Sequence, residues 1–479
     1  MTLQLSDLWT EQRQAVDFLY ERDHSLLLAD IGMGKTVMVL TVLKAWLEEE
    51  VADRVLVLAP TRVCQQVWRQ ECGEWAHLRH TNIANLAGES LHKRKQAIEG
   101  TDMKYPADIL LINYELLPWF MAEYPDGAGC NVLVCDEIDK LKSPKSQRFK
   151  GGVLPTGKRV PGMKRYRGIF DSVIGMTGTP VPNHLIDLWA QVFTVDGGKR
   201  LGDNFYRFRD EFFYPKKSWG GFTQFEPREF AAPEIEDCIA DITYRIESSS
   251  ASGVRPEVRE LPVRWLELPR KLQEPYRGME KHFITDVGAN TVTALNAGVQ
   301  YGKLRQFAQG FVYTDEEGGF DELSSFKLKA LDELISELQG QQLLIVYHYQ
   351  AQAALLKRRY RREIRFLGGG VSQSAANKTI DDWNAGRLQL LAVHPQSAGH
   401  GLNLQKSGAH HIVMLTLPET AGEYKQVVGR LARTSNKAKY VMIHRILAKR
   451  TVDADRVTAV HEKIVFQDDL LDRMKGRHQ

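Results

Sequence analysis

The chain lacks the marks of several large classes of protein. Its 479 residues include five cysteines, and none of these fall in C-x-x-C spacing, so neither a zinc site nor a disulfide framework is expected. None of the 14 histidines belongs to an H-E-x-x-H motif. There is no N-terminal signal pattern and no apolar run of membrane-spanning length. These absences favour a protein of a reducing, intracellular compartment with no membrane partner.

A large excess of charge of one sign is also missing. Lysine and arginine total 63 and aspartate and glutamate total 60, which gives a net charge of only +3. Any surface that binds nucleic acid must therefore be local. There are no internal repeats or low-complexity tracts. The hydrophobic content of 43% and charged content of 26% are ordinary for globular proteins, and the length suggests about three domains.

A glycine-containing loop near the N-terminus predicts a phosphate site. The apolar run Ser25–Ala29, expected to be a buried strand, leads through Gly32 and Gly34 to Lys35 and Thr36. An apolar-periodic helix is expected to follow directly. In such a loop, backbone N–H groups bind the phosphates, the lysine reaches the β- and γ-phosphates, and the threonine hydroxyl holds Mg²⁺. Ala29 replaces the first glycine of G-x-x-x-x-G-K-[ST]. The alternative, an ordinary strand-to-helix turn, fits the flanking pattern less well.

Buried strands alternate with helical stretches along much of the chain. This alternation is typical of an α/β fold with parallel sheets covered by helices on both faces. Ligands in such sheets bind at the carboxyl ends of the strands. The strands are expected at 25–29, 54–60, 107–114, 131–137 and 172–180, and again at 342–347, 364–367, 388–393, 411–415 and 440–446.

Two further groups of residues complete the chemistry of a nucleotide hydrolase. Asp136 and Glu137 follow an apolar strand, where one carboxylate can hold Mg²⁺ and the other can orient the attacking water. Arg430 and Arg433 are three residues apart, so we expect them to share a helix face. There they could meet the charge that develops on the γ-phosphate. A solvated basic helix face is the alternative for an isolated R-x-x-R.

Together these segments resemble superfamily 2 helicases and, within them, the Swi/Snf-type DNA-dependent ATPases. The matches run in the expected order from about residue 8 to residue 455. They comprise Asp30–Thr36, Asp136–Asp139, Thr177–Pro180 with the following Asn183–Trp189, Ala398–Leu404 and Gln426–Arg433. The T-G-T-P segment with its downstream N-x-L-x-x-L-W is the most specific match.

The resemblance implies two RecA-like domains in tandem, with ATP and Mg²⁺ as cofactors. It implies that Gln12 reads adenine, that Gly401 belongs to the ATP site, and that Arg62 contacts nucleic acid. It further implies that Thr177, Thr179 and Gln426 couple the nucleotide state to the grip on DNA. Such compact versions look like those of phages and bacteria, so we expect a cytoplasmic protein of a bacterium or a phage-infected cell.

The expected domains are residues 1–200, a RecA-like ATP-binding domain; 201–315, a mostly helical insertion; and 316–479, a RecA-like helicase domain. A basic, glycine-rich loop at about 143–168 could contact the phosphate backbone or be a solvated insertion. The basic run 357–362 fits a solvated helix face slightly better than a DNA contact. The aromatic side chains between 205 and 222 could stack on bases, but packing in a small helical core is the better interpretation.

Three hypotheses for function follow. The first is a DNA-dependent ATPase that translocates on duplex DNA, or remodels branched DNA or protein–DNA complexes, with little sequence specificity. The second is a strand-separating DNA or RNA helicase, which needs a wedge that the sequence does not reveal. The third is a nucleotide-gated clamp without turnover. The set of Lys35, Asp136, Glu137, Arg430 and Arg433 argues against the third. Pathway, polarity, oligomeric state and protein partners are left open.

Overall fold

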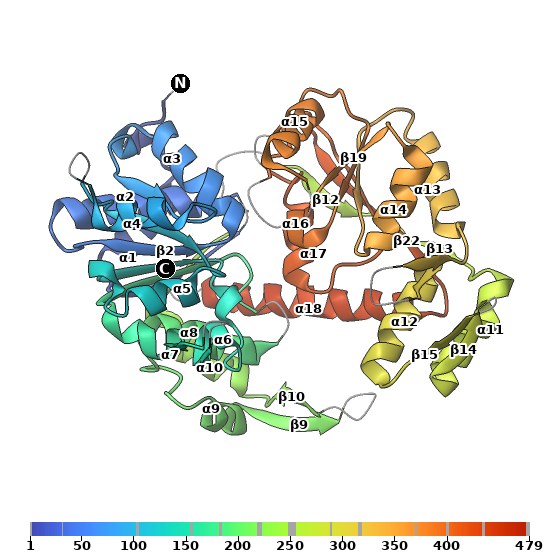
Figure 1. Ribbon diagram of the computed structural model, residues 1–479, viewed down its shortest axis with the longest axis horizontal. Helices are drawn as coiled ribbons and strands as arrows, with labels where there is room; N and C mark the ends of the chain where they lie inside the picture. Colours follow the sequence, from blue (N-terminus) through green and yellow to red (C-terminus); the bar gives the residue numbers. More distant parts are fainter. Residues whose placement is uncertain are drawn as a thin grey trace. The chain divides into compact units, whose positions relative to one another are not determined.

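A computed structural model describes residues 2–30, 32–101, 105–153, 157–181, 184–217, 223–247, 255–287, 290–314, 319–368, 371–398, 402–433 and 436–475. The chain forms two compact units (Figure 1). The first is built mainly from Met1–Ser218 and Thr223–Ser252, and the second mainly from Gly253–Val465. Within the described residues, no helix combines the length and the apolar character needed to cross a membrane.

The first unit is organised around a seven-stranded sheet in which every pair of neighbours is parallel. Its order is β11 (Thr243–Ile246), β1 (His24–Ala29), β8 (Ser172–Thr177), β5 (Val132–Asp136), β2 (Val55–Ala59), β4 (Ile109–Asn113) and β3 (Ile83–Asn85). Its helices are α1 (Thr10–Tyr20), α2 (Lys35–Glu48), α3 (Trp68–Glu74), α4 (Leu91–Glu99), α5 (Leu117–Glu123), α6 (Gln147–Lys150), α7 (Met163–Tyr166), α8 (Leu188–Asp196), α9 (Phe205–Phe212) and α10 (Ala231–Ile239).

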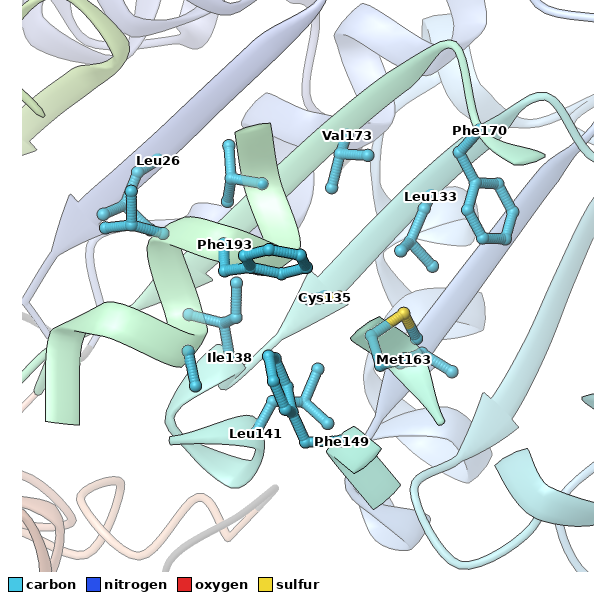
Figure 2. Close-up of a cluster of buried hydrophobic side chains, with 14 of the residues drawn as sticks. Leu26, Leu133, Cys135, Ile138, Leu141, Phe149, Met163, Phe170, Val173 and Phe193 are labelled. Carbon is cyan, nitrogen blue, oxygen red and sulfur yellow. The ribbon is translucent and has the colours of Figure 1, made fainter. Parts of the chain in front are cut away.

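Side chains of this sheet alternate between two cores, as the period of a strand requires. Leu26, Leu133 and Val173 belong to the core that α5, α8 and α10 help to form, and Figure 2 shows part of it with Phe193 of α8. Leu27, Val134 and Ile174 belong to the core on the other face, together with residues of α1, α2 and α3. Burial on both faces explains why these strands are continuous apolar runs.

The second unit repeats this plan. Its parallel sheet has the order β12 (Glu257–Glu260), β22 (Tyr440–Ala448), β21 (His411–Met414), β18 (Leu343–Val346), β20 (Leu390–Val393) and β19 (Ile364–Leu367), and β13 (Arg264–Leu266) also pairs with β22. The helices from this part of the chain are α11 (Arg270–His282), α12 (Ala297–Gln309), α13 (Phe326–Glu337), α14 (Gln350–Tyr360), α15 (Gln373–Asn384), α16 (Pro395–Ala398), α17 (Ala421–Val428) and α18 (Val452–Lys475). Two parallel sheets flanked by helices confirm the predicted fold class.

The stretch 201–315 differs from the mostly helical insertion that we predicted. Its residues divide between the two units: β11 is an edge strand of the first sheet, whereas β12 and β13 pair with β22 in the second. α11 and α12 pack in a separate apolar cluster of the second unit. The stretch also contributes antiparallel hairpins, of β9 (Phe213–Lys217) with β10 (Thr223–Pro227) and of β14 (Ile284–Val287) with β15 (Asn290–Thr293), and β16 (Phe311–Tyr313), which pairs with β17 (Phe320–Glu322).

A buried histidine pair in the second sheet makes stability depend on pH. His411 Nδ1 lies 3.0 Å from His444 Nε2, and His411 Nε2 lies 3.0 Å from Gln341 Oε1. Burial lowers the pKa of each histidine to about 4, with nearby His410 adding to the effect on His411 and Arg264 to that on His444. The unfolded chain, with a histidine pKa of about 6.5, therefore binds more protons than the folded chain between these values.

Folding stability is accordingly expected to fall as the pH drops from about 6.5 to about 4, with a slope of up to about 1.4 kcal/mol per pH unit for each histidine. Urea unfolding at several pH values measures this slope. His444→Asn should have a shallower slope than the wild type, whereas His92→Gln, at an exposed histidine, should keep it. Equal slopes in all three proteins would contradict the role of the pair.

Candidate functional site

The phosphate loop lies between β1 and α2, at the carboxyl edge of the first sheet. Gly32 and Gly34 have φ values of +85° and +76°, a conformation that glycine adopts without a Cβ penalty. α2 begins at Lys35, and Gly34 is its N-cap. The Lys35 ammonium donates to the carbonyl of Ala29 over 2.8 Å, and Thr36 is buried in the first turn of the helix. Loop, lysine and helix start are thus arranged as the sequence predicted.

Gln12 of α1 is packed against this loop. Its side-chain N–H donates to the carbonyl of Met33 over 3.0 Å, and its Oε1 accepts from the backbone N–H of Trp9 over 2.9 Å. A Cβ at Gly34 would lie only 2.5 Å from Gln12 Nε2. The residue predicted to read adenine therefore directly supports the loop that is predicted to bind phosphate.

Gly34→Ala is expected to weaken nucleotide binding about tenfold, because the new methyl group meets Gln12 and because the left-handed backbone costs about 1 kcal/mol. Binding of a fluorescent ATP analogue measures this effect. Gly302→Ala is the matched control: Gly302 lies within α12, and a Cβ there meets nothing within 4 Å. Unchanged affinity in Gly34→Ala would show that the loop is not the nucleotide site.

The two carboxylates lie where β5 ends. Asp136 is its last residue and is buried, and Glu137 follows with a φ of +57°. The Tyr114 hydroxyl donates to the carbonyl of Asp136 over 2.9 Å and lies 3.3 Å from the carbonyl of Glu137. This contact holds a backbone turn that is unusual for a residue with a side chain.

Electrostatics at Asp136 fit a bound cation. Burial and the Glu137 charge raise the pKa of Asp136 to about 7, and the Lys35 charge opposes this rise. A divalent cation would favour the ionised carboxylate. Asp136 and the hydroxyl of Thr36 are oxygen donors of the kind that Mg²⁺ prefers. The residues present therefore fit the metal that the sequence predicted.

Thr177 connects Glu137 to the neighbouring strand. It is the last residue of β8, which lies between β1 and β5, and it is fully buried. Its hydroxyl is 3.4 Å from Glu137 Oε2 and accepts the backbone N–H of Thr179 over 3.0 Å. Of the two threonines that we predicted to couple the nucleotide state to DNA grip, Thr177 thus contacts the predicted base, and Thr179 contacts Thr177.

Arg62 follows the end of β2, beyond Pro60, and precedes a helical turn at Val63–Val67. Burial lowers the pKa of its guanidinium group, which is half-buried. The adjacent Thr61 hydroxyl accepts from the Asn113 side chain over 3.1 Å. This position at a strand end is the one that the sequence predicted, and its contact with nucleic acid stays a prediction.

In the second unit, Arg430 and Arg433 are not on a helix face, contrary to our prediction. α17 carries the buried Gln426 but ends at Val428, and both arginines lie in the turns that follow. Arg430 donates to the carbonyl of Leu402 over 3.3 Å, and Arg433 donates to the Asn403 side chain over 2.6 Å. The backbone of this stretch forms turns, with Arg430 N–H donating to Val427 and Ala432 N–H donating to Val428, while the two side chains bond to the separate segment at Leu402 and Asn403. Gly401, predicted to belong to the ATP site, lies outside the described residues.

Arg255 is a neighbour of these arginines that the sequence did not indicate. It precedes β12 and donates to the carbonyl of Ala432 through Nη2 over 2.6 Å and through Nε over 3.2 Å. Burial and the Arg255 charge lower the pKa of Arg433 to about 10. Arg255 is separated by more than a hundred residues from the motif that it contacts, so only the fold brings them together.

The stretch 143–168 is more structured than the basic loop that we predicted. It contains α6, α7 and a hairpin of β6 (Gly151–Val153) with β7 (Arg159–Pro161), whereas residues 154–156 lie outside the described part. Arg148 pairs with Glu115 at 2.7 Å, and Arg167 is buried with its guanidinium on the carbonyls of Phe170 and Val195. Several of its charges therefore have partners within the unit.

The basic run 357–362 agrees with the preferred interpretation, whereas the buried aromatic residues of the stretch 205–222 pack in a different core from the small helical one that we predicted. On α14, Arg358 pairs with Glu322 and Arg359 with Asp332, as expected of a solvated basic helix face. Among the aromatic residues, Phe208, Phe212 and Phe213 are buried in the core of the first unit and not in a helical core of their own. The predicted stacking candidates Trp219 and Phe222 lie outside the described residues.

Comparison with known proteins identifies both halves of the chain. Residues 11–216 match the SNF2-related domain, and residues 326–435 match the helicase conserved C-terminal domain. The chain is 31% identical, over 477 residues, to putative protein p41 of Acyrthosiphon pisum secondary endosymbiont phage 1, and the match covers 97% of the chain and 98% of the phage protein.

Longer relatives match at lower identity. The CHD3-type chromatin-remodeling factor CHR7 of Arabidopsis thaliana is 22% identical over 96% of the chain, and Zorya protein ZorD of Escherichia coli is 23% identical over 94%. The chain spans only 37% and 42% of these two proteins. A solved structure of the Sulfolobus solfataricus SWI2/SNF2 ATPase core in complex with dsDNA matches 98% of the chain and 94% of its own, with 18% identity and a TM-score of 0.41.

Proposed function

Because the chain belongs to the SNF2-related family of superfamily 2 helicase-like ATPases, we propose that it hydrolyses ATP in response to duplex DNA and uses the energy to translocate along it. The observation that carries this proposal lies in the first sheet. Lys35, Asp136, Glu137 and Thr177 gather at the carboxyl ends of three adjacent strands, β1, β8 and β5. This is where a parallel sheet binds a ligand.

The roles of these residues follow from their chemistry. The loop glycines and Lys35 bind the phosphates, and Glu137 orients the attacking water as the base. Thr36 and Asp136 hold Mg²⁺, which when bound supplies positive charge to the phosphate oxygens. Because Thr177 contacts Glu137, a shift of the segment from Thr177 to Thr179 would change the position of the base. This contact is the route by which we infer that DNA stimulates hydrolysis.

Arg430 and Arg433 act, in this proposal, on the charge that develops on the γ-phosphate. Asn403 and the carbonyl of Leu402 hold them before the reaction, so little reorganisation is needed. Thr61 and Arg62 contact the DNA backbone and not base edges, which accounts for binding with little sequence specificity. Duplex or branched DNA is thus the proposed partner, and alternating grip by the two units drives the movement.

Displacement of a third strand tests translocation separately from strand separation. The substrate is a blunt duplex that carries a triplex-forming oligonucleotide, and a forked duplex is assayed in parallel. We expect ATP-dependent release of the third strand with no unwinding of the fork. Robust unwinding of the fork with little stimulation of ATP hydrolysis by duplex DNA would contradict the proposal and favour a strand-separating helicase.

A further inference from the structure

The indole ring of Trp68 contacts the carboxylate that we propose to bind Mg²⁺. Its N–H donates to Asp136 Oδ2 over 3.2 Å. Trp68 is 0% exposed and Asp136 is 5% exposed, so water does not compete for this bond. A hydrogen bond from a neutral donor to a buried carboxylate is strong, and it restricts rotation of the carboxylate about its Cβ–Cγ bond.

A π-helical turn brings this indole to the carboxylate. After β2, the chain forms the π turn Val63–Val67, and α3 begins at Trp68 itself. A π turn changes the direction in which the following side chains point compared with a regular helix, and such turns are frequent at functional sites. The placement of Trp68 on Asp136 therefore depends on this irregularity.

The surroundings of Asp136 leave few groups to stabilise its charge. The adjacent Glu137 is also acidic, and both burial and this charge disfavour the ionised form. Lys35 and the indole N–H of Trp68 oppose them. Groups that hydrogen-bond to a metal ligand fix the orientation of that ligand. Their removal typically lowers metal affinity 10- to 100-fold.

We propose that Trp68 is a positioning residue for the metal: its N–H holds the carboxylate of Asp136 in the orientation that binds Mg²⁺. The proposal rests on the proposed role of Asp136 as the metal carboxylate. Loss of the Trp68 N–H should therefore raise the Mg²⁺ concentration that nucleotide binding needs. Nucleotide affinity without metal should depend on the phosphate loop alone.

Titration of Mg²⁺ against binding of a fluorescent ATP analogue, in the full-length protein, tests this proposal without measuring catalysis. Trp68→Phe keeps an aromatic ring but has no N–H. We expect the Mg²⁺ concentration at half-saturation to rise about tenfold. Binding in the presence of a chelator should change less than about twofold.

Trp75→Phe is the matched control. Trp75 is also buried, also follows the π turn, and donates its indole N–H to Glu71 Oε2 over 3.1 Å. We expect this variant to keep the wild-type Mg²⁺ requirement. If Trp68→Phe fails to fold, a benzothienyl side chain at position 68, with sulfur in place of N–H, keeps the bicyclic shape and should give the same tenfold shift.

The possible results distinguish failure of the role proposed for Trp68 from failure of the proposed function on which that role rests. A wild-type Mg²⁺ requirement in Trp68→Phe or in the sulfur isostere, together with a raised requirement in Asp136→Asn, would overturn the role of Trp68 alone. If Asp136→Asn binds the analogue with the wild-type dependence on Mg²⁺, the metal site itself is wrong. Equal weakening with and without Mg²⁺ in Trp68→Phe would show a purely structural role and would overturn the proposal.

Discussion

Glu137→Gln is expected to lower kcat for ATP hydrolysis by about 100- to 1,000-fold, because the amide cannot accept a proton from the attacking water. The substitution keeps the shape of the side chain and an oxygen that can accept the bond from Thr177. Binding of ATP should therefore stay close to that of the wild type. Single-turnover hydrolysis and binding of an ATP analogue measure the two effects separately.

Glu115→Gln is the control for this variant. Glu115 is an exposed carboxylate of the same unit that pairs with Arg148, and its loss should leave hydrolysis within about twofold of the wild type. Normal hydrolysis by Glu137→Gln would show that another group acts as the base. A large loss of nucleotide affinity would instead assign Glu137 to binding.

Arg430→Ala and Arg433→Ala are each expected to lower kcat by about 1,000-fold, as removal of an arginine from phosphoryl transfer typically does. Because the developing charge appears only in the transition state, the KM for ATP should change far less than kcat. Steady-state kinetics with saturating duplex DNA measure both constants. Arg430→Lys and Arg433→Lys keep the charge but lose the fork of donors, so they should recover only a small part of the rate.

A structural role for these arginines predicts different results. Each is bonded to the segment at Leu402 and Asn403, so removal could disturb the second unit without affecting chemistry. Thermal unfolding detects that effect. Arg359→Ala, on the ion-paired face of α14, is the matched control and should keep wild-type kcat. Loss of stability with unchanged kcat in Arg430→Ala would contradict the catalytic assignment.

The parts of the fold that could be predicted from sequence are those fixed by burial on both faces of a sheet. All of β2, and β5 up to its last residue Asp136, are apolar because helices cover both faces of the sheet. Of the two edge strands of the second sheet, β19 was predicted at 364–367, but β12 could not be predicted in this way. All four residues of β12 are exposed, and main-chain pairing with β22 defines it, which no side-chain pattern reveals.

Some residues of the candidate site could likewise be predicted from the sequence, and others could not. Lys35, Asp136 and Glu137 lie within short contiguous motifs at strand ends, and topology brings those ends together. Arg255 could not be found, because its bond to Ala432 joins segments that are distant in sequence. The position of Arg430 after the end of α17 was missed as well, since its bond to Leu402 is likewise a contact between distant segments.

The rate of ATP hydrolysis with different nucleic acids decides whether this protein is an ATPase that duplex DNA stimulates. The wild-type protein is assayed alone and with single-stranded DNA, blunt duplex DNA, branched DNA and RNA in turn, at equal nucleotide concentration. We expect a low rate without nucleic acid, and strong stimulation by duplex or branched DNA that is independent of sequence and is lost in Glu137→Gln. A rate that is the same with and without duplex DNA, or stimulation by RNA alone, would contradict the proposed function.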